Sequence, residues 1–330
     1  MDILVMGGTR FNGLHLVYEL IKHGHNVTIL NRGITQTPIP QNVRRLYADR
    51  KNTEELKRTL KDLVFDVIFD ISAYVLDDVQ SITEIMEGRT GHYIFASSTV
   101  VYAQSNLLPI TEEYPVDNGP NQSDYGRNKL ICEDFLRKLY MKSHFPMTIA
   151  RFSMVFGPDN NLINREQRMF IRLLNSRKIL IPGRGTTLSQ IGHVDDEARA
   201  LRLMARNQHT FGEIYNVTGK DYFSDEVYVD ICANVVGVNS DKLFVPADTM
   251  DSMPMEIRQT LIQRLAPYIH RWDQSTVFSI NKLRDHLQFE PEYNLESAME
   301  QTYEWFVREN IRDQRGYDFS DENAIINNLS

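Results

Sequence analysis

Cysteine is scarce in this chain: only Cys132 and Cys232 occur among 330 residues, and they lie 100 positions apart. A disulfide framework or a cysteine-rich zinc site needs more cysteines at closer spacing. The nine histidines include no pair four residues apart, which is the spacing of two metal ligands on one helix face. We therefore expect no metal site, and we expect a reducing compartment, the cytoplasm.

Long hydrophobic runs are also missing. No apolar stretch approaches the roughly 20 residues of a membrane-spanning helix, so no membrane association is expected. Met1-Asp2 leads directly into an apolar run, without the charged start of a signal peptide. The net charge of −8 argues against a general binder of nucleic-acid backbones. With 42% hydrophobic and 24% charged residues, the composition is that of a globular protein with a sizeable core.

Short apolar runs alternate with longer amphipathic segments along the first half of the chain. The runs predict strands at 3–6, 26–30, 46–48, 67–71, 93–96 and 148–152. Helical periodicity predicts helices at 14–23, 53–63, 77–86 and 125–141. Buried strands that alternate with helices indicate an α/β fold with a doubly wound parallel sheet of Rossmann type.

A glycine-rich turn, Gly7-Gly8-Thr9-Arg10-Phe11-Asn12-Gly13, joins the first strand to the first helix. Glycines there let backbone N–H groups and the helix N-terminus approach a pyrophosphate. The usual motif has its middle glycine where this chain has Arg10. We expect a dinucleotide to contact Gly7, Thr9, Arg10, Phe11, Asn12 and Gly13; the alternative is a simple tight turn.

The end of the second strand bears on the choice between NAD and NADP. Asn31 and Arg32 stand where an acidic residue would hold the adenosine ribose and repel a 2′-phosphate. Arg32 and Arg10 can pair with that phosphate, so NADP is preferred over NAD; the alternative is that Arg32 is a solvated loop residue. Asp49, after the third strand, is placed to accept a hydrogen bond from the adenine amino group or to cap the following turn.

After residue 156 the regular alternation of predicted strands and helices ends. Helices are expected at 165–176 and 195–206, and short strands at 179–181 and 213–217. We interpret 1–177 as the NAD(P)-binding Rossmann domain, to which some later segments return. We interpret 178–330 as mainly a smaller C-terminal α/β cap that binds the substrate.

Tyr125 and Lys129 are four residues apart and therefore share one face of the predicted helix. The lysine ammonium can lower the pKa of the phenol and hold a ribose hydroxyl, while a serine hydroxyl polarises a carbonyl or alcohol. Ser98, with Ser97 as the neighbouring alternative, ends a strand 27 positions before Tyr125. Such a trio moves a proton at the carbon where a nicotinamide exchanges a hydride.

Together these motifs resemble the extended short-chain dehydrogenase/reductase family, which includes sugar-nucleotide epimerases, dehydratases and reductases. The resemblance covers nearly the whole chain, through Gly7–Gly13, Asp49-Arg50, Ser97–Tyr102, Tyr125 with Lys129, Arg151–Pro158 and Gly192–Asp196 with Ala198. It implies that Tyr125 is the acid/base, Lys129 the ribose anchor and Ser98 the hydroxyl donor. It also implies that Ile71, Ser72 and Ala73 line the pyrophosphate and that Phe152 lies beside the nicotinamide, although sheet-edge packing is the alternative for each.

Departures from the family pattern narrow the function. Thr99 and Val100 stand where 4,6-dehydratases of the family have an Asp-Glu pair, which argues against dehydration by that route. Met154 replaces the asparagine usual in sugar-nucleotide enzymes, and Ser189–Gly192 lacks their diphosphate-binding arginine. The candidates that remain for a substrate phosphate are Arg165, Arg184 and Arg271, unless they are exposed salt-bridge residues. In the His193–Asp196 stretch, we expect Asp195 to cap a helix that starts near Glu197 rather than to take part in catalysis.

Gly7–Phe11 and Ser189–Val194 also resemble an atypical branch of the family that is UDP-glucose 4-epimerase-like and includes chloroplast stem-loop RNA-binding proteins. Our interpretation is an NAD(P)-dependent epimerase or reductase acting on a hydroxyl or keto carbon of a sugar-like, nucleotide-linked small molecule. The alternative is a non-catalytic cofactor-binding protein that binds structured RNA. The intact tyrosine and lysine and the acidic charge favour the enzyme. The resemblance also implies a homodimer formed through helices near 77–87 and 125–141, although the apolar stripe of the second helix is also explained by packing on the sheet.

Overall fold

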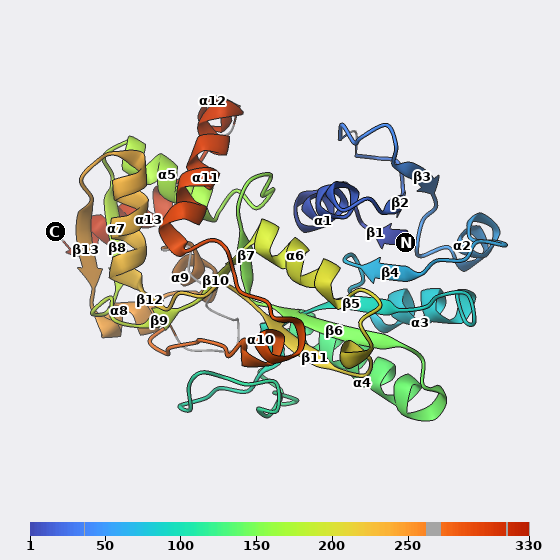
Figure 1. Ribbon diagram of the computed structural model, residues 1–330. Helices are drawn as coiled ribbons and strands as arrows, with labels where there is room; N and C mark the ends of the chain where they lie inside the picture. Colours follow the sequence, from blue (N-terminus) through green and yellow to red (C-terminus); the bar gives the residue numbers. More distant parts are fainter. Residues whose placement is uncertain (36, 262–271, 315, 330) are drawn as a thin grey trace.

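A parallel sheet of seven strands forms the centre of the larger part of the protein (Figure 1). The computed structural model describes residues 1–35, 37–261, 272–314 and 316–329. The strand order is β11-β6-β5-β4-β1-β2-β3. The strands are β1 Asp2–Met6, β2 Asn26–Asn31, β3 Arg44–Tyr47, β4 Val67–Asp70, β5 Tyr93–Ser98, β6 Met147–Phe152 and β11 Ile214–Val217.

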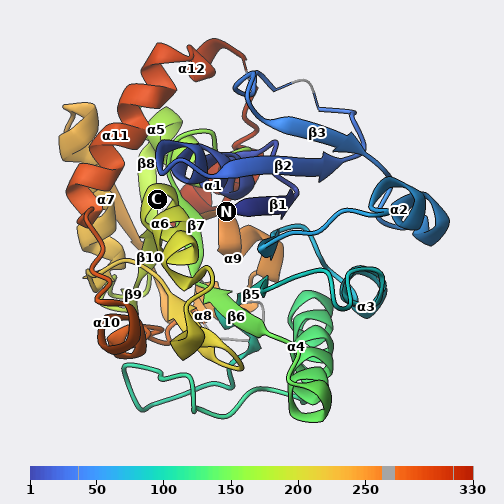
Figure 2. The same cartoon turned by 45° about the vertical axis from the view of Figure 1, so that its right-hand side comes forward.

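Helices cover both faces of this sheet (Figure 2). One face packs against α1 Phe11–Lys22, α6 Val194–Met204 and α10 Asn281–Leu287, and the other against α2 Thr53–Thr59, α3 Leu76–Ile85 and α4 Asp124–Ser143. In β1, Ile3 and Val5 face the first helix layer while Leu4 and Met6 face the second. A strand that is buried on both sides must be apolar at every position, which explains the short apolar runs. The predicted doubly wound α/β fold is confirmed.

A second, smaller group of elements lies at the left in Figure 1 and has its own hydrophobic core between α5, α7 and α11. Its strand pairs are β7 Met154–Phe156 with β10 Ile191–His193, β8 Lys178–Pro182 with β13 Asp241–Val245, and β9 Leu188–Ser189 with β12 Phe223–Ser224. Its helices are α5 Glu166–Leu174, α7 Asp225–Val236, α8 Ala247–Ser252, α9 Met255–Leu261, α11 Leu295–Arg308, α12 Ile311–Gln314 and α13 Ser320–Leu329. Because α6, α10 and β11 belong to the layers of the main sheet, the chain crosses between the two parts several times; the division at 177/178 stays a prediction.

Several helices and strands begin or end a few residues away from their predicted boundaries, because local backbone geometry sets these ends. The first helix begins at Phe11, three residues before its apolar periodicity begins, because Arg10 is extended and the helix starts directly after it. The helix predicted for 53–63 ends at Thr59, since Asp62 has a φ of 61°, in the left-handed region. The strand predicted at 46–48 lies at Arg44–Tyr47.

The prediction that Asp195 caps a helix starting near Glu197 is wrong. The helix α6 begins at Val194, and its N-cap is His193, whose Nδ1 accepts a hydrogen bond from the Asp195 N–H at 3.4 Å. The Asp195 carboxylate instead lies 2.5 Å from Nδ1 of His15 on α1. Nε2 of His15 faces Asp159 at 3.3 Å. Burial alone would lower the pKa of His15, but the two carboxylates raise it to about 9. A charged bridge thus joins α1 to α6, which the sequence did not reveal.

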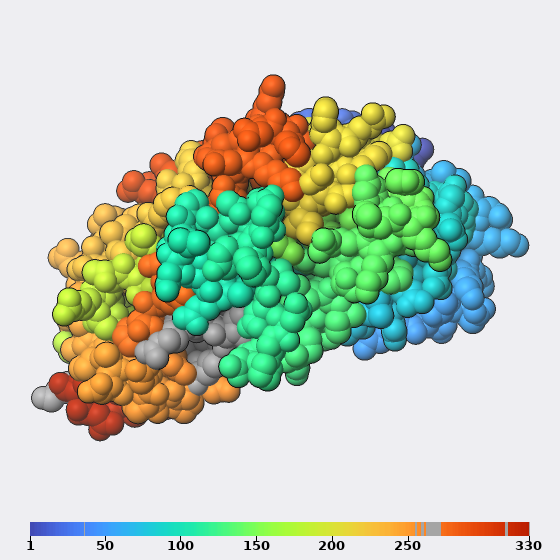
Figure 3. Space-filling model, turned by 90° about the horizontal axis from the view of Figure 1, so that it is seen from below, coloured from blue at the N-terminus to red at the C-terminus, as the bar shows by residue number. Residues whose placement is uncertain are grey.

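The segment 102–123 connects the 3₁₀ turn η1 (Thr99–Val101) to α4 and lies on the face seen in Figure 3, in teal and green. Backbone hydrogen bonds join it to the C-terminal part of the chain. Ile110 N–H donates to the Val277 carbonyl, and the Ile110 carbonyl accepts from Ser279 N–H, both at 2.8 Å. A second 3₁₀ turn, η2 Gln208–Thr210, precedes β11. The segment therefore fixes the start of α4, the helix that carries the tyrosine and lysine predicted to be catalytic.

Candidate active site

The structure brings Ser98, Tyr125 and Lys129 together at the carboxyl edge of the sheet. Ser98 ends β5, and the other two residues lie on the first two turns of α4. That helix starts where it does because Ser123 caps it, with its Oγ accepting from Gly126 N–H at 3.0 Å. The Ser98 hydroxyl lies close enough to the Tyr125 phenol to lower its pKa, and it also accepts a hydrogen bond from Val100 N–H at 3.3 Å. The Lys129 ammonium lies 5.6 Å from the centre of the Tyr125 ring. Their catalytic roles stay predictions.

Ser97, the neighbouring alternative, points into a different network. Its hydroxyl donates to Oε1 of Glu133 at 2.5 Å, and that carboxylate also accepts from Arg151 at 2.6 Å. All three residues are buried. The geometry therefore favours Ser98 as the hydroxyl that faces Tyr125, because Ser97 is occupied by a structural ion pair between α4 and β6.

Lys129 is buried, and its ammonium donates to the backbone carbonyls of Ala73 at 2.7 Å and Ala96 at 2.6 Å. Burial lowers the pKa of Lys129 to about 8, although the negative charge of Asp70 acts in the opposite direction. At pH 7 the side chain is therefore mainly cationic, and its role as the ribose anchor stays a prediction.

Tyr125 is 36% exposed, which is more than Lys129 on the same helix, at 3%. Burial of the rest of the side chain raises the pKa of Tyr125 to about 12, and neighbouring Tyr74 adds to this, whereas the Ser98 hydroxyl lowers it. In this state the phenol is neutral and can give a proton to a carbonyl oxygen. The Tyr74 ring lies 5.9 Å from that of Tyr125 and is 59% exposed. Sequence reasoning missed Tyr74, which carries no motif beyond following Ala73.

The glycine-rich turn has the geometry of a pyrophosphate cradle. Gly7 has a φ of 96°, which favours glycine, and a Cβ on Gly13 would lie 2.2 Å from the Gly7 carbonyl oxygen. Arg10 is exposed and makes no side-chain cap, which leaves the N-terminus of α1 available to an anion. Oδ1 of Asn12 is buried without a hydrogen-bond partner among the described residues. These features fit the phosphates of a dinucleotide.

On the adenosine side, the structure gives several predicted contacts a local partner. Oδ1 of Asn31 accepts from Gly33 N–H at 2.8 Å, and Oδ1 of Asp49 accepts from Lys51 N–H at 3.0 Å. Arg32 is exposed, which agrees with the alternative that it is a solvated loop residue. Both side-chain oxygens thus cap turns, and the adenosine contacts stay predictions.

The remaining predicted contacts lie along the same edge. Ser72 is half-buried and abuts Gly7, where an added Cβ would lie 2.8 Å from the Ser72 Cβ. Ile71 and Ala73 flank it after β4, and Phe152 is buried at the end of β6. Ser72 thus contacts the glycine-rich turn and Ala73 accepts from Lys129, whereas the cofactor contacts of all four residues stay predictions.

Two charged residues next to Ser72 were given no role by the sequence: Asp70, and Arg50, which was named only as part of a family motif. Asp70 is completely buried and pairs with Arg50 at 2.8 Å. The available signal was an aspartate closing an otherwise apolar strand, since a buried charge requires an opposite charge nearby.

The arginines proposed for a substrate phosphate differ in position. Arg165 donates to the Val155 carbonyl at 2.9 Å, and its charge acts to lower the pKa of Tyr125, so it lies near the site. Arg184 is exposed, and Arg271 lies outside the described residues.

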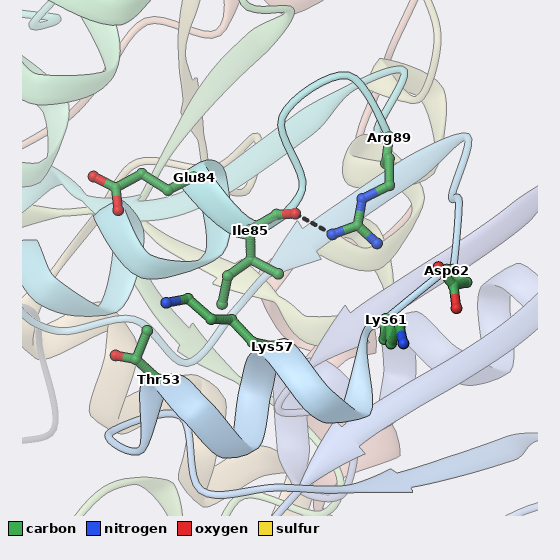
Figure 4. A pocket seen from close by; sticks show the side chains of 7 residues that line it. All are labelled: Thr53, Lys57, Lys61, Asp62, Glu84, Ile85 and Arg89. Atoms are coloured by element: carbon green, nitrogen blue, oxygen red, sulfur yellow. Dashed lines mark hydrogen bonds between the residues drawn. The ribbon is translucent and has the colours of Figure 1, made fainter.

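A separate hollow of about 340 Å³ lies between α2 and α3 (Figure 4). Arg89 reaches into it and donates to carbonyl oxygens of Leu60 and Ile85, near the C-terminal ends of the two helices. Its other lining side chains carry both signs of charge, as in Lys57, Lys61, Asp62 and Glu84. Arg89 thus caps helix ends, and the hollow shares no residue with the trio.

The described residues also bear on metal binding and on membrane-spanning helices. Among the described residues, no group of three or more histidine, cysteine, aspartate or glutamate side chains is placed to hold a metal ion. In the same part of the chain, no helix combines the length and apolar character needed to cross a membrane.

Residues 3–218 match the model of the NAD dependent epimerase/dehydratase family. The chain is 30% identical to the chloroplast stem-loop binding protein of 41 kDa b from Arabidopsis thaliana, over 98% of this chain and 84% of that protein. It is 27% identical to UDP-arabinose 4-epimerase 1 from the same plant, over 78% of this chain and 74% of that enzyme. A UDP-glucuronic acid 4-epimerase from Bacillus cereus, solved with NAD, superposes with a TM-score of 0.74 at 22% identity, over 93% of this chain and 97% of that one.

The fold and the assembled trio define an enzyme of the extended short-chain dehydrogenase/reductase type. The chain belongs to the NAD-dependent epimerase/dehydratase family. Its relatives support a sugar-epimerase-like function with NAD as the cofactor class.

One buried carboxyl near the site leads to a pH-dependent prediction. Glu197 on α6 is buried, and neither of its oxygens has a hydrogen-bond partner among the described residues. Burial and the charge of Asp196 raise the pKa of Glu197 well above its ordinary value. Above about pH 4.5 the unfolded chain loses this proton while the folded chain keeps it, which destabilises the fold by about 1.4 kcal/mol per pH unit until the folded group ionises.

We therefore expect Glu197→Gln to be more stable than the wild type, with a gain that grows from pH 5 to pH 7. Denaturant unfolding at both pH values measures it. Glu300→Gln, which changes an exposed glutamate on α11, is the control and should show no such pH dependence. A gain of equal size at both pH values would show that Glu197 is ionised in the folded protein.

Proposed function

We propose that this protein is an NAD(P)-dependent epimerase or reductase that acts on a hydroxyl or keto carbon of a sugar-like, nucleotide-linked substrate. The observation that carries the proposal is the assembly of Ser98, Tyr125 and Lys129 next to a turn suited to a pyrophosphate. Sugar-nucleotide epimerases among its relatives support the substrate class. We further propose that it acts as a cytoplasmic homodimer; two buried free cysteines agree with a reducing compartment.

The side chains divide the chemistry between them. A bound nicotinamide supplies the hydride acceptor and donor. Tyr125 takes the proton of the substrate hydroxyl or returns it to the ketone oxygen, and Ser98 donates a hydrogen bond to the same oxygen. The Lys129 ammonium holds the ribose and favours the ionised phenol through its positive charge. An epimerase and a reductase use the same proton transfers and differ in whether the ketone is reduced again on its other face or released.

We propose NADP as the preferred cofactor. A polar hollow of about 420 Å³, here called the adenosine-side hollow, opens at the carboxyl end of β2 and is lined by Asn31, Gly33, Thr35, Thr37, Arg45 and Tyr47, with Pro38. Thr37 donates to the Thr9 carbonyl at 2.8 Å, so the hollow adjoins the glycine-rich turn. Arg45 lines this hollow, and Arg10 and Arg32 lie in the turns that follow β1 and β2. The three side chains supply positive charge for a 2′-phosphate.

Nucleotide analysis tests this proposal. The freshly purified protein is denatured, the released nucleotide is identified by chromatography and mass, and the emptied protein is titrated with NADPH and NADH. Tightly held NAD(H) would indicate an epimerase that recycles its cofactor and would overturn the NADP preference. Micromolar binding of NADPH would indicate a reductase that exchanges its cofactor. Binding of neither would contradict the enzymatic proposal.

Arg45→Leu should weaken NADPH binding about tenfold and leave NADH binding unchanged, because one charge-assisted hydrogen bond contributes about 1.5–3 kcal/mol. Fluorescence titration of both cofactors measures the difference. Arg44→Leu changes the exposed neighbour in β3 and is the matched control. Equal weakening of both cofactors would show that Arg45 does not read the 2′-phosphate.

The alternative function, binding of structured RNA, is favoured by one observation: the similarity to a chloroplast stem-loop binding protein. Salt-sensitive RNA binding that survives Tyr125→Phe would support it. The net charge of −8 and the complete trio favour the enzyme.

A further inference from the structure

The Arg50 guanidinium makes four hydrogen bonds next to the glycine-rich turn and its neighbour Ser72. Arg50 follows Asp49 in the turn after β3, and its guanidinium reaches the end of β4. Nη1 donates to Oδ1 of Asp70 at 2.9 Å and Nη2 donates to Oδ2 at 2.8 Å. This two-pronged pairing fixes the plane of the guanidinium as well as its position. Burial alone would raise the pKa of Asp70, but Arg50 and the Tyr93 hydroxyl, at 2.7 Å, hold it below its usual range.

The same guanidinium ties together three segments of the site. It donates to the Ser72 hydroxyl and to the Asp78 carbonyl, both at 2.8 Å. Its Nε lies 3.1 Å from Oδ1 of Asp78, whose other carboxylate oxygen accepts from Tyr74 N–H at 2.8 Å. The turn after β3, the segment after β4 and the first turn of α3 are thereby held by one side chain. Because Ser72 abuts Gly7, the glycine-rich turn is held indirectly as well.

Lys129 also lies within reach of the charge of Asp70. Its ammonium is fastened to the carbonyl of Ala73, the residue that follows Ser72. The charged and titratable groups that face it are Asp70 from β4, Arg50 from the turn after β3, Cys132 and Glu133 from α4, and the tyrosines Tyr74 and Tyr125. Asp70 favours the cationic lysine, and Arg50 opposes it through like charge.

We propose that Arg50 and Asp70 form a positioning pair which holds the Ser72–Ala73 segment for the cofactor and sets the charge environment of Lys129. The inference rests on the cofactor binding proposed above. Arg50 and Asp70 touch neither the substrate nor the reacting atoms, so both act through other residues. Arg50 fixes the geometry by its bonds to Asp70, Ser72 and Asp78. Asp70 supplies the negative charge that keeps Lys129 cationic at neutral pH.

A direct titration of Lys129 in the cofactor-free protein tests the electrostatic part. The ¹³Cε resonance of Lys129, assigned by its loss in Lys129→Arg, is followed against pH, and the wild type should titrate near pH 8. Asp70→Asn should lower the midpoint by about one pH unit, because an attractive charge is removed. Arg50→Met should raise it, because a repelling charge is removed while the Tyr93 hydroxyl and the Lys129 charge still favour an ionised Asp70. Opposite shifts distinguish an electrostatic role from loss of structure.

Arg50→Lys tests the positioning part and guards against a variant that does not fold. It keeps the positive charge but loses the bidentate pairing with Asp70 and the bonds to Ser72 and Asp78. We expect the Lys129 midpoint to stay near that of the wild type while binding of NADH and NADPH weakens about tenfold, which corresponds to about 1.4 kcal/mol. Arg89→Met is the matched control, since it removes an arginine that bonds to helix-end carbonyls away from Lys129. In Arg89→Met, the titration midpoint of Lys129 and the binding of NADH and NADPH should equal those of the wild type.

Two results would overturn the pairing: an unchanged midpoint in Asp70→Asn, or shifts of the same sign in Asp70→Asn and Arg50→Met. Unchanged cofactor affinity in Arg50→Lys would overturn the positioning role. These outcomes are separate from failure of the proposed function. A wild type that binds neither NADH nor NADPH would contradict the enzyme, while the Lys129 titration would still report on Asp70.

Discussion

Tyr125→Phe should lower turnover by about a thousandfold while cofactor affinity stays within a fewfold of the wild type. The substitution removes only the phenol oxygen, which is the group that exchanges a proton with the substrate, and positioned acid/base groups contribute roughly 10²–10⁴ in rate. The ring that packs beside Tyr74 and Lys129 is kept, so the cofactor site keeps its shape. Turnover with UDP-sugars and direct titration of NADPH and NADH measure the two effects separately.

Tyr74→Phe is the matched control for this prediction. It removes a phenol hydroxyl from the adjacent exposed ring, 5.9 Å away, without touching the proposed acid/base. We expect turnover to change by only a fewfold. Near-normal turnover in Tyr125→Phe, or an equal loss in both variants, would contradict the assignment of Tyr125.

Glu322→Gln should be the most destabilising of the substitutions considered. Glu322 on α13 is buried, and its Oε1 accepts from Arg168 at 2.8 Å and from Arg172 at 2.7 Å. Arg172 is completely buried on α5. Removing one partner of a buried ion pair leaves uncompensated charge and costs about 3–5 kcal/mol. We expect the thermal midpoint to fall by about 5 °C, as measured by calorimetry.

Asp321→Asn changes the neighbouring exposed carboxylate of α13 and should shift the midpoint little. A second variant, Glu322→Gln combined with Arg172→Met, removes one cation together with the carboxylate and should recover part of the lost stability. If Glu322→Gln were no more destabilising than Asp321→Asn, the two arginines would be compensated by other groups.

The sequence predicted the sheet and the trio because both depend on local patterns. Strands buried on both faces are apolar at each position, as in Ile3–Met6, and the helix carrying Tyr125 and Lys129 is read from its periodicity. Parallel strands also end at one edge of a sheet, which is why Ser98 and the glycine-rich turn lie at the same edge. The relation to known epimerases confirmed the family and the fold, while the site roles stay predictions.

The choice between Ser97 and Ser98 required the tertiary structure, since neighbouring residues of a strand point to opposite faces and the strand end was uncertain by one residue. Asp195 was interpreted wrongly because its partner His15 lies 180 positions earlier. Such pairings are set by how α1 packs against α6, and no periodicity along the chain encodes them.

By itself, then, the sequence determined the alternation of strands and helices, the cofactor turn and the spacing of the tyrosine and lysine. Only the tertiary structure decided which buried charges meet: Arg50 with Asp70, Arg151 with Glu133, and Glu322 with two arginines 150 and 154 positions away. The physical reason is that hydrophobic burial leaves a repeating pattern in one segment, whereas a buried charge needs one specific partner that the folded chain alone brings within reach.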